Sequence, residues 1–404
     1  MSVGDSEEII APSTLRGINR HCKIKDNVIT ITKNRYKESR KPLMKRNFLR
    51  VRPFLVVVLL SGLTSGLLDV TEPSPQTDAR SKSDANSPIQ GNVAPKQTQG
   101  PVNGKFKPLS NAGASAEARE LYGYLCGQEG NGILAGQQES TWVRGNPEDE
   151  MEYIQEHTGK LPAIRGLDYI AYNGVTERSI QWWNRGGIVS ICWHWGAPSK
   201  GMGYRASKLE IDVEQALTPG TQLNRILIAD LDRTAEELLK LKEARVPVLW
   251  RPYHELNGHW FWWSKAGPDA LKRLWKLMYQ RYTQKFELDN LIWVFGFTST
   301  IDAKWYPGDE FVDIIGADTY DPGPHAEMYQ SLKQEFGNRV LTCLHECGPI
   351  PAPTELQKGT TNWSWFLTWH TKHIKSQNTI EAIREIYNHP YVITLDELPA
   401  FSKH

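Results

Sequence analysis

Eight apolar, strand-like runs alternate with helical patterns from residue 114 onward. The runs span residues 132–138, 161–168, 187–195, 246–255, 290–297, 311–320, 339–346 and 363–370. Two helices are predicted between them, at residues 232–244 and 269–286. The second carries a stripe at helical spacing, made of Leu271, Leu274, Trp275, Met278 and Tyr282. Apolar strands joined by helices indicate a parallel sheet, and eight such units predict an α/β fold, a (β/α)8 TIM barrel over residues 114–404.

A doubly wound open sheet is the structural alternative, and the first strand argues against it. Nucleotide-binding sheets of that type carry a glycine-rich G-x-G-x-x-G turn after their first strand. Residues 132–140 read GILAGQQES, which ends in polar residues without that pattern. The barrel is therefore the preferred prediction.

A barrel places its chemistry at the carboxyl ends of its strands. In this sequence those ends are polar and aromatic, and they include Gln137, Gln138, Glu139, Arg165, Asp168, Trp193, His194, Trp195, His254, Glu255, Asp318, Tyr320, His345, Glu346, Trp369 and His370. Fifteen Trp in the chain add to this pattern, although more than half of them are expected to pack in the core. The rim predicts a polar cleft with aromatic walls.

Two glutamates among these rim residues form a candidate acid pair. Glu255 ends the fourth predicted strand and Glu346 the seventh, so both side chains point toward the barrel mouth from opposite sides. Glycosidic bond hydrolysis requires such a pair, one carboxylic acid to protonate the leaving oxygen and one carboxylate to attack or to activate water. Other carboxylates compete for these roles, namely Asp168, Asp230, Asp318 and Asp321.

The stretch RPYHELNGHWFWW at residues 251–263 also raises the possibility of a zinc site. In the helical H-E-x-x-H motif the two His are four apart and point within about 40° of each other. His254 and His259 are five apart, which on a helix separates them by roughly 140°. Pro252 and the turn signal Asn257-Gly258 also disfavour a helix. We therefore predict no metal at this motif.

Three motifs resemble those of glycoside hydrolase family 26, in clan A, whose best-known members are endo-β-1,4-mannanases. They are R-P-Y-H-E-L-N-G-H-W-F-W-W at 251–263, C-W-H-W at 192–195 and H-E-C-G at 345–348. The first is long and specific, and the resemblance covers roughly residues 115–400. It implies a retaining, endo-acting hydrolase that cleaves β-1,4-mannosidic bonds by double displacement without a cofactor or metal.

The resemblance also implies roles for the acid pair. Glu255 is the general acid/base and Glu346 the nucleophile. An acid/base must hold a proton near neutral pH, and we expect aromatic neighbours to raise the pKa of Glu255 by removing water. Tyr320, which by the resemblance hydrogen-bonds Glu346, would favour the ionised form of the nucleophile.

Four further residues are assigned to substrate binding by the resemblance. His254 contacts the sugar at the cleavage point, where most of clan A carries Asn, and His194 binds the substrate. Trp260 lines the subsites, and Trp369 forms the platform under the sugar on the non-reducing side of the cleaved bond. We expect His259 to be a loop side chain of no catalytic consequence.

The implied substrate is a β-mannan, galactomannan or glucomannan. β-1,3-Xylanases and mixed-linkage β-glucanases also occur in the family, and the W-F-W-W tail of the strand-four motif, which we expect to wall the cleft, leans towards mannan. The long connection at 196–230 is expected to shape the subsites. A non-catalytic polysaccharide-binding barrel is the alternative of another class, although such proteins usually lose one of the two acids.

The N-terminal part of the chain differs from the barrel. Residues 44–68 begin with Met44, continue with basic residues and then run apolar from residue 54, which predicts a secretory signal peptide and an extracellular or periplasmic protein. The alternative is an uncleaved membrane anchor through residues 54–68. No pattern explains residues 1–43, which are interpreted either as an artefact of the gene model or as a cytoplasmic tail. The composition of residues 69–113 predicts a flexible linker.

Charge and cysteine usage limit the partners further. The formal net charge of +1 provides no electrostatic basis for binding nucleic acid, and we expect a monomer. Export permits disulfides, but Cys343 and Cys347 on one strand would lie about 13 Å apart, too far to bond. With Cys126 and Cys192 they are predicted to be buried free thiols.

Overall fold

The structure is a computed structural model that describes residues 24–25, 28–29, 102–141 and 145–401. The predicted signal segment at 44–68 and most of the segments at 1–43 and 69–113 lie outside the described residues. Within residues 1–43, two short strands, β1 (Ile24–Lys25) and β2 (Val28–Ile29), pair antiparallel as a unit of their own. Among the helices of the described residues, none is long and apolar enough to cross a membrane.

Eight parallel strands close into a barrel, as predicted. They are β3 (Ile133–Gln138), β4 (Ile164–Asp168), β5 (Ile188–Cys192), β6 (Val248–Arg251), β7 (Leu291–Phe297), β8 (Ile314–Thr319), β9 (Leu341–Cys347) and β10 (Trp365–Thr368). Neighbours in sequence are neighbours in the sheet, and β10 pairs with β3 to complete the circle. A short strand, β11 (Val392–Ile393), adds to the start of β3.

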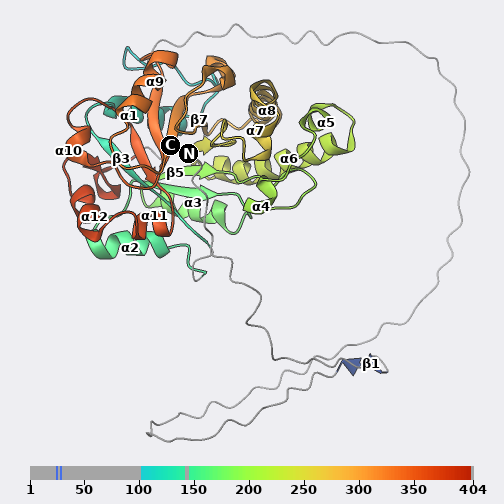
Figure 1. Ribbon diagram of the computed structural model, residues 1–404, viewed down its shortest axis with the longest axis horizontal. Helices are drawn as coiled ribbons and strands as arrows, with labels where there is room; N and C mark the ends of the chain where they lie inside the picture. The colour runs from blue at the N-terminus through green and yellow to red at the C-terminus, as the bar shows by residue number, and fades with distance from the viewer. Residues whose placement is uncertain (1–23, 26–27, 30–101, 142–144, 402–404) are drawn as a thin grey trace, which may run out of the picture. The chain divides into compact units, whose positions relative to one another are not determined.

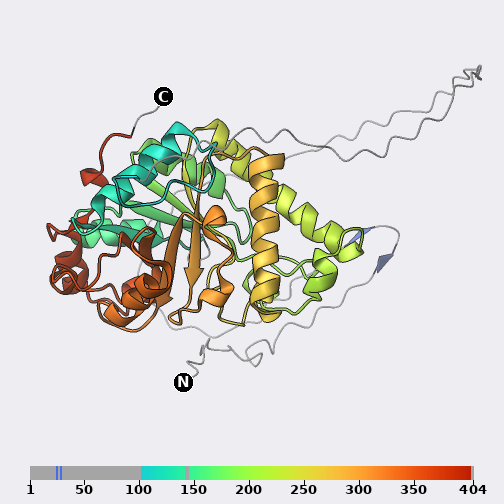
Figure 2. The same cartoon turned by 90° about the horizontal axis from the view of Figure 1, so that it is seen from above.

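Helices surround the strands (Figures 1 and 2). The longer ones are α1 (Ala116–Gln128), α2 (Asp149–Thr158), α3 (Val175–Asn184), α6 (Gln222–Glu243), α8 (Pro268–Gln280), α9 (Ala326–Phe336) and α12 (Ile380–Tyr387). Single-turn helices lie in the loops, at α4 (Tyr204–Ser207), α5 (Val213–Leu217), α7 (Trp262–Lys265), α10 (Pro353–Leu356) and α11 (Lys372–Lys375). The connection from β7 to β8 contains two 3-10 helices, at Ala303–Trp305 and Asp309–Phe311, in place of a full helix.

The boundaries of the two predicted helices differ from those in the structure. The helix expected at 232–244 begins ten residues earlier, because Thr221 accepts a hydrogen bond from the Asn224 amide and caps α6. The connection expected at 196–230 is therefore a loop only up to residue 221. The helix predicted at 269–286 is present as α8, followed by a π-helical turn at Arg281–Lys285.

Two apolar layers hold the barrel. Alternate residues of the strands face outward and pack against the helices, whereas Ile164, Ile188 and Leu341 share an interior cluster with residues of α1. Phe106 and Leu109 belong to the same interior cluster. Residues 102–113, which the composition assigns to the linker, thus pack with the apolar barrel interior, and the folded domain starts before residue 114.

The cysteines of the described residues match the prediction. Cys126, Cys192, Cys343 and Cys347 are all buried free thiols. Cys343 and Cys347 lie on the same strand, β9, so their side chains are separated along the strand and cannot meet.

Candidate active site

The interior of the barrel changes from apolar to polar along each strand. In β5, Ile188 faces the interior cluster, and the alternation of side chains points Cys192 and His194 the same way. In β6, Leu249 belongs to that cluster and Arg251 follows at the strand end. The carboxyl ends of the strands therefore gather the charged and imidazole groups at one mouth, as a TIM barrel requires.

A β-bulge in β9 brings two consecutive side chains into the site. The register of β9 shifts by one residue between Leu344 and Glu346 against β8, and it also shifts against β10. Strict alternation from the inward-facing Cys343 would turn Glu346 outward toward the helices. The extra residue in the bulge re-aims the carboxylate, so that His345 and Glu346 both reach the interior.

Two donors hold the carboxylate of Glu346. The guanidinium of Arg251 lies 2.9 Å from Oε2, and the hydroxyl of Tyr320 donates to Oε1, the contact that the resemblance implies. Nε2 of His345 is 2.9 Å from the Phe297 carbonyl, which makes Nδ1 the acceptor for Arg251 at 2.8 Å. Burial and the Arg251 charge keep the pKa of His345 well below its usual value, so the ring is neutral. The carboxylate is thus oriented with its charge balanced, as a nucleophile requires.

Glu255 lies in a tight loop after β6, not within the strand. The strand ends at Arg251, and the backbone of Glu255 has a φ of 51°, in the left-handed region that few residues other than glycine adopt. Asn257 ties the loop to the segment after β7: its side-chain oxygen accepts from the Thr298 amide at 3.0 Å, and its nitrogen donates to the Thr300 carbonyl at 2.7 Å. These bonds hold an unusual backbone that aims Glu255 into the cleft.

Gly258 explains how an aromatic ring reaches the same carboxylate. A Cβ at this position would lie 2.4 Å from the indole of Trp260, so only glycine lets the ring fold back over the loop. Trp260 Nε1 then donates to Oε2 of Glu255 at 2.7 Å. The Asn257-Gly258 turn signal of the sequence is therefore a requirement of the site itself.

Three carboxylates meet at the centre of the mouth. Glu255, Asp318 and Glu346 each present one oxygen, and these oxygens lie within 4.8 Å of one another. Burial raises the pKa of Glu255, the charge of Glu346 raises it further, and hydrogen bonds to Asp318 and Trp260 oppose the rise. Burial, followed by the charge of Glu255, raises the pKa of Asp318 well above its usual range. Glu255 and Asp318 therefore hold a proton between them at a pH where isolated carboxyls are ionised.

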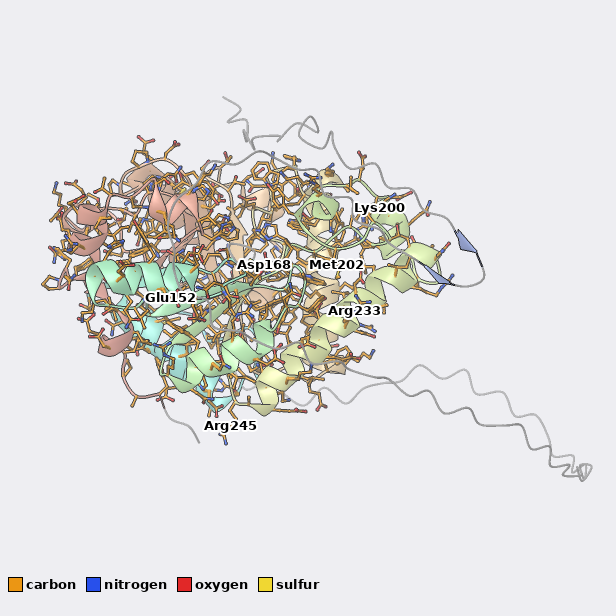
Figure 3. The ribbon with its side chains drawn as sticks, turned by 90° about the horizontal axis from the view of Figure 1, so that it is seen from below. Glu152, Asp168, Lys200, Met202, Arg233 and Arg245 are labelled. Carbon is orange, nitrogen blue, oxygen red and sulfur yellow. The ribbon has the colours of Figure 1, made fainter. Side chains whose placement is uncertain are left out.

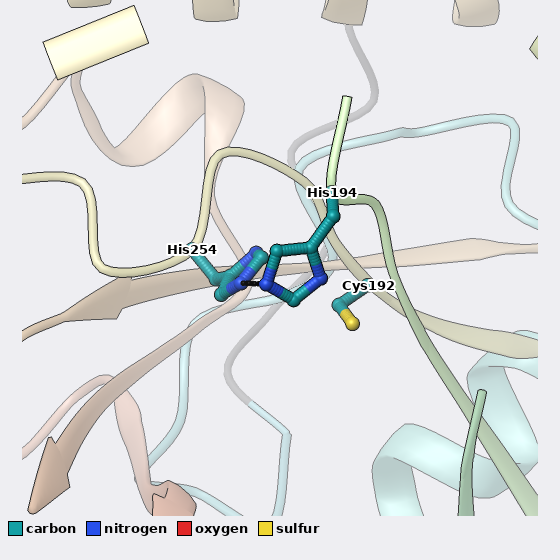
Figure 4. A group of neighbouring side chains, drawn as sticks. All are labelled: Cys192, His194 and His254. Atoms are coloured by element: carbon teal, nitrogen blue, oxygen red, sulfur yellow. Dashed lines mark hydrogen bonds between the residues drawn. The ribbon is translucent and has the colours of Figure 1, made fainter. Parts of the chain in front are cut away.

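His194 and His254 lie side by side next to the carboxylates. Their Nε2 atoms are 3.2 Å apart (Figure 4). Nδ1 of His194 is 2.5 Å from Oδ2 of Asp168. Burial lowers the pKa of His194, but the charge and hydrogen bond of Asp168 outweigh it, so the pKa is raised. Burial and the charge of His194 place the pKa of His254 well below its usual value. His194 is thus the more basic ring of the pair.

The aromatic residues divide into cleft and core. Trp260 is 40% exposed beside Glu255, and Trp369 is partly exposed, with its ring centroid 5.9 Å from that of His194. Trp262 and Trp263, which we expected to line the cleft with Trp260, are buried instead. They pack around the loop, and Trp263 Nε1 donates to the His254 carbonyl at 3.2 Å.

Two competing carboxylates have other surroundings. Asp321 is exposed, and Asp230 accepts from Trp195 Nε1 at 3.2 Å outside the strand barrel. Asp230 lines a cavity of about 270 Å³ together with Met202 and Arg233, which Figure 3 labels. Asp168 and Asp318 belong to the site, as partners of His194 and Glu255.

The geometry thus unites the predicted site residues and adds others. The predicted acid pair and its five predicted neighbours all lie at this mouth: Glu255, Glu346, His194, His254, Trp260, Tyr320 and Trp369. Arg251 was not singled out from the sequence, although it opens the RPYHE motif. Asp318 was considered only as a competitor, because no local pattern shows that it touches Glu255.

Two groups within the described part of the chain have the composition of metal ligands. One is the carboxylate trio, and the other consists of Cys192, His194 and His254. His259 belongs to neither group; it is exposed and lies edge-on to Trp305, with ring centroids 5.3 Å apart. Residues 252–261 are not helical, as predicted, but the last two residues of the motif begin the single-turn helix α7.

Comparison with known proteins identifies the family. The sequence profile described as glycosyl hydrolase family 26 matches residues 110–397. The chain belongs to glycosyl hydrolase family 26. The matched range covers the barrel, including both motif glutamates, and extends before residue 114, in agreement with the packing of that segment.

The similar curated proteins are named as mannanases. A mannan endo-1,4-beta-mannosidase of Thermothelomyces thermophilus is 37% identical over 317 residues, 72% of this chain and 63% of the relative. Mannan endo-1,4-beta-mannosidase A of a Piromyces species is 33% identical over 321 residues, 74% of this chain and 52% of the relative. The chain thus spans less than two thirds of the length of these relatives.

Solved structures of mannanases share the fold. The Podospora anserina GH26-CBM35 β-(1,4)-mannanase superposes with a TM-score of 0.68 at 36% identity, covering 74% of this chain and 70% of that one. A β-mannanase from a symbiotic protist of the termite Reticulitermes speratus, complexed with gluco-manno-oligosaccharide, has a TM-score of 0.66 at 31% identity. That match covers 73% of this chain and 99% of the protist protein.

Proposed function

We propose that this protein is a retaining endo-β-1,4-mannanase that hydrolyses mannan, galactomannan or glucomannan. The observation that carries the proposal is the pairing of Glu255 and Glu346, whose nearest oxygens lie within 4.8 Å. Retaining enzymes place the two carboxyl groups about 5–5.5 Å apart, whereas inverting enzymes leave about 6.5–9.5 Å for a water molecule. The short separation favours direct attack over attack by water.

The surroundings of the two acids support a division of labour. Glu346, paired with Arg251 and bonded by Tyr320, is oriented to attack the anomeric carbon. Glu255, whose pKa burial raises, donates a proton to the departing oxygen and then removes one from water in the second step. Asp318 shares the proton of Glu255 between these steps.

The remaining rim residues fit sugar recognition. The exposed faces of Trp260 and Trp369 can stack on the C–H faces of sugar rings. We assign the buried His194 and His254, next to the carboxylates, to contacts with sugar hydroxyls. Mannanase names among the relatives, and the gluco-manno-oligosaccharide in the protist structure, support a mannan-type substrate.

A substrate panel tests the activity. Purified protein is incubated with mannan, galactomannan, glucomannan, β-1,3-xylan and barley β-glucan, and released reducing ends are measured. We expect release from the mannans, early oligosaccharide products and retained anomeric configuration by NMR. Glu255→Ala and Glu346→Ala should each abolish turnover of the polysaccharide. Release from β-1,3-xylan or β-glucan alone would reassign the substrate, and folded wild-type protein without release from any polymer would indicate a binding barrel.

We further propose that the protein is exported through residues 44–68 and acts as a monomer without a metal cofactor. The basic and apolar pattern of that segment supports export. Fractionation of expressing cells and N-terminal sequencing of the product test the signal, and protein retained on membranes would favour an anchor. Light scattering tests the monomer, and unchanged turnover in a chelator tests metal independence.

A further inference from the structure

One thiol and two imidazoles meet at the floor of the cleft. Cys192, the last residue of β5, lies beneath His194, and His254 reaches the same point from the loop after β6 (Figure 4). One ligand atom of each residue lies within 4.8 Å of the other two, and all three side chains are buried. A sulfur with two nitrogens is a donor set for zinc and softer ions, whereas calcium and magnesium prefer oxygen.

The spacing of the imidazole nitrogens matches a shared ion. Two zinc–nitrogen bonds of about 2.0–2.1 Å at the tetrahedral angle span about 3.3 Å, and a zinc–sulfur bond of about 2.3 Å spans about 3.6 Å to either nitrogen. The Nε2 atoms of His194 and His254 are 3.2 Å apart. The two nitrogens therefore already have the spacing of ligands to one ion, and the Cys192 sulfur, which lies within 4.8 Å of a nitrogen of each ring, has to approach to about 3.6 Å.

The surroundings prepare both rings for coordination. Asp168 lies 2.5 Å from Nδ1 of His194, which leaves Nε2, the nitrogen that faces His254, as the ligand atom of this ring. A carboxylate on the far nitrogen is the usual partner of a metal-bound histidine. Nδ1 of His254 is buried with no hydrogen-bond partner in the described structure, so tilting that ring toward an ion breaks only its bond to His194.

We propose that Cys192, His194 and His254 bind one divalent ion of the zinc and cadmium class, and that the bound ion inhibits the enzyme. The thiol loses its proton to solvent, the thiolate sulfur and two imidazole nitrogens each donate an electron pair to the ion, and water completes a tetrahedral shell. Inhibition rests on the proposed mannanase function, because the same two imidazoles are proposed to contact the sugar. Binding itself does not depend on that function.

Inhibition by metal ions is measured with the full-length protein and with two cysteine variants of it. Turnover of a mannan is followed in Zn²⁺, in Mg²⁺ and in chelator, and each variant is normalised to its own rate in chelator. We expect Zn²⁺ to inhibit and Mg²⁺ to have no effect. Cys192→Ser should raise the inhibition constant for Zn²⁺ at least about tenfold, since even groups that only support a ligand contribute about 10- to 100-fold. Cys126→Ser, at a buried free thiol of α1, should leave the constant unchanged.

Binding is measured on the wild-type protein without substrate. X-ray absorption of the Zn²⁺-loaded protein should show one sulfur at about 2.3 Å and two imidazole nitrogens at about 2.0–2.1 Å. A shell of oxygen and nitrogen without sulfur would overturn the site, even where Cys192→Ser fails to fold. Equal Zn²⁺ sensitivity of Cys192→Ser and wild type, or equal inhibition by Mg²⁺, would overturn it as well. A protein with the expected shell but no polysaccharide activity would refute the mannanase and keep the metal site.

Discussion

Replacing Trp260 with Phe isolates the electrostatic contribution of one hydrogen bond to the acid/base. The indole nitrogen donates to Oε2 of Glu255 at 2.7 Å, and Phe keeps an aromatic ring while removing the donor. A hydrogen bond to a charged group contributes about 1.5–3 kcal/mol. Because Trp260 is 40% exposed, solvent screening reduces this to about 0.7–1.4 kcal/mol. A factor of ten in an equilibrium corresponds to about 1.4 kcal/mol, so the loss of this bond should raise the pKa of Glu255 and increase the ratio of protonated to ionised acid about three- to tenfold at a given pH.

The direction of the pKa change follows from the protonation form of Glu255 that the hydrogen bond from Trp260 stabilises. The indole donor favours ionised Glu255, so its loss favours the protonated acid, and the basic limb of the profile of kcat/KM against pH moves to higher pH. That limb reports the proton held by Glu255 and Asp318 together. The assay is the pH dependence of kcat/KM on a soluble manno-oligosaccharide for wild type, Trp260→Phe and Trp260→Ala.

Trp260→Ala serves as the control that also removes the ring. It should shift the basic limb in the same direction and in addition raise KM, because a stacking surface for the sugar is lost. An unchanged or lowered basic limb in Trp260→Phe would refute the reasoning. So would a shift confined to the acid limb of the profile.

Two further perturbations address the nucleophile and the core. Tyr320→Phe removes the hydroxyl that donates to Glu346 but leaves Arg251 in place, so we expect kcat to fall about 10- to 100-fold with an unchanged melting temperature; a rate within twofold of wild type would contradict the role. Leu274→Ala opens a cavity at a fully buried position of α8 and should lower the free energy of unfolding by about 2–5 kcal/mol in urea titrations. Leu209→Ala, 47% exposed, should change it by no more than about 0.5 kcal/mol, and equal effects would refute the burial argument.

Local patterns in the sequence were sufficient to predict the architecture. Eight apolar runs predicted eight strands in the right places, because a strand buried on both faces must be continuously apolar. The stripe containing Leu274 predicted α8, since helical spacing directs one face inward. The start of α6 was missed because its N-cap, Thr221, lies in a polar stretch that local periodicity does not distinguish from a loop.

The sequence also predicted that Glu255 and Glu346 meet at the barrel mouth, and the structure brings them together, although the geometric reason was partly wrong. Glu255 was placed at a strand end, but the strand stops at Arg251 and a left-handed loop carries the glutamate. The motif remained informative because Asn257 and Gly258, which make that loop possible, belong to it. Trp262 and Trp263 could not be separated from Trp260 by sequence, because aromatic residues fill both cores and clefts.

The sequence by itself determined the barrel, the mouth that gathers its polar residues and the two glutamates that meet there, because each depends on local periodicity or on a contiguous motif. Only the tertiary structure decided that Glu346 faces the cleft, since a bulge in β9 overrides the alternation of its strand. It also decided that Asp318 lies against Glu255 and that Cys192 meets His194 and His254. These relations join residues from different strands and loops, and their distances are set by barrel closure, which local sequence does not encode.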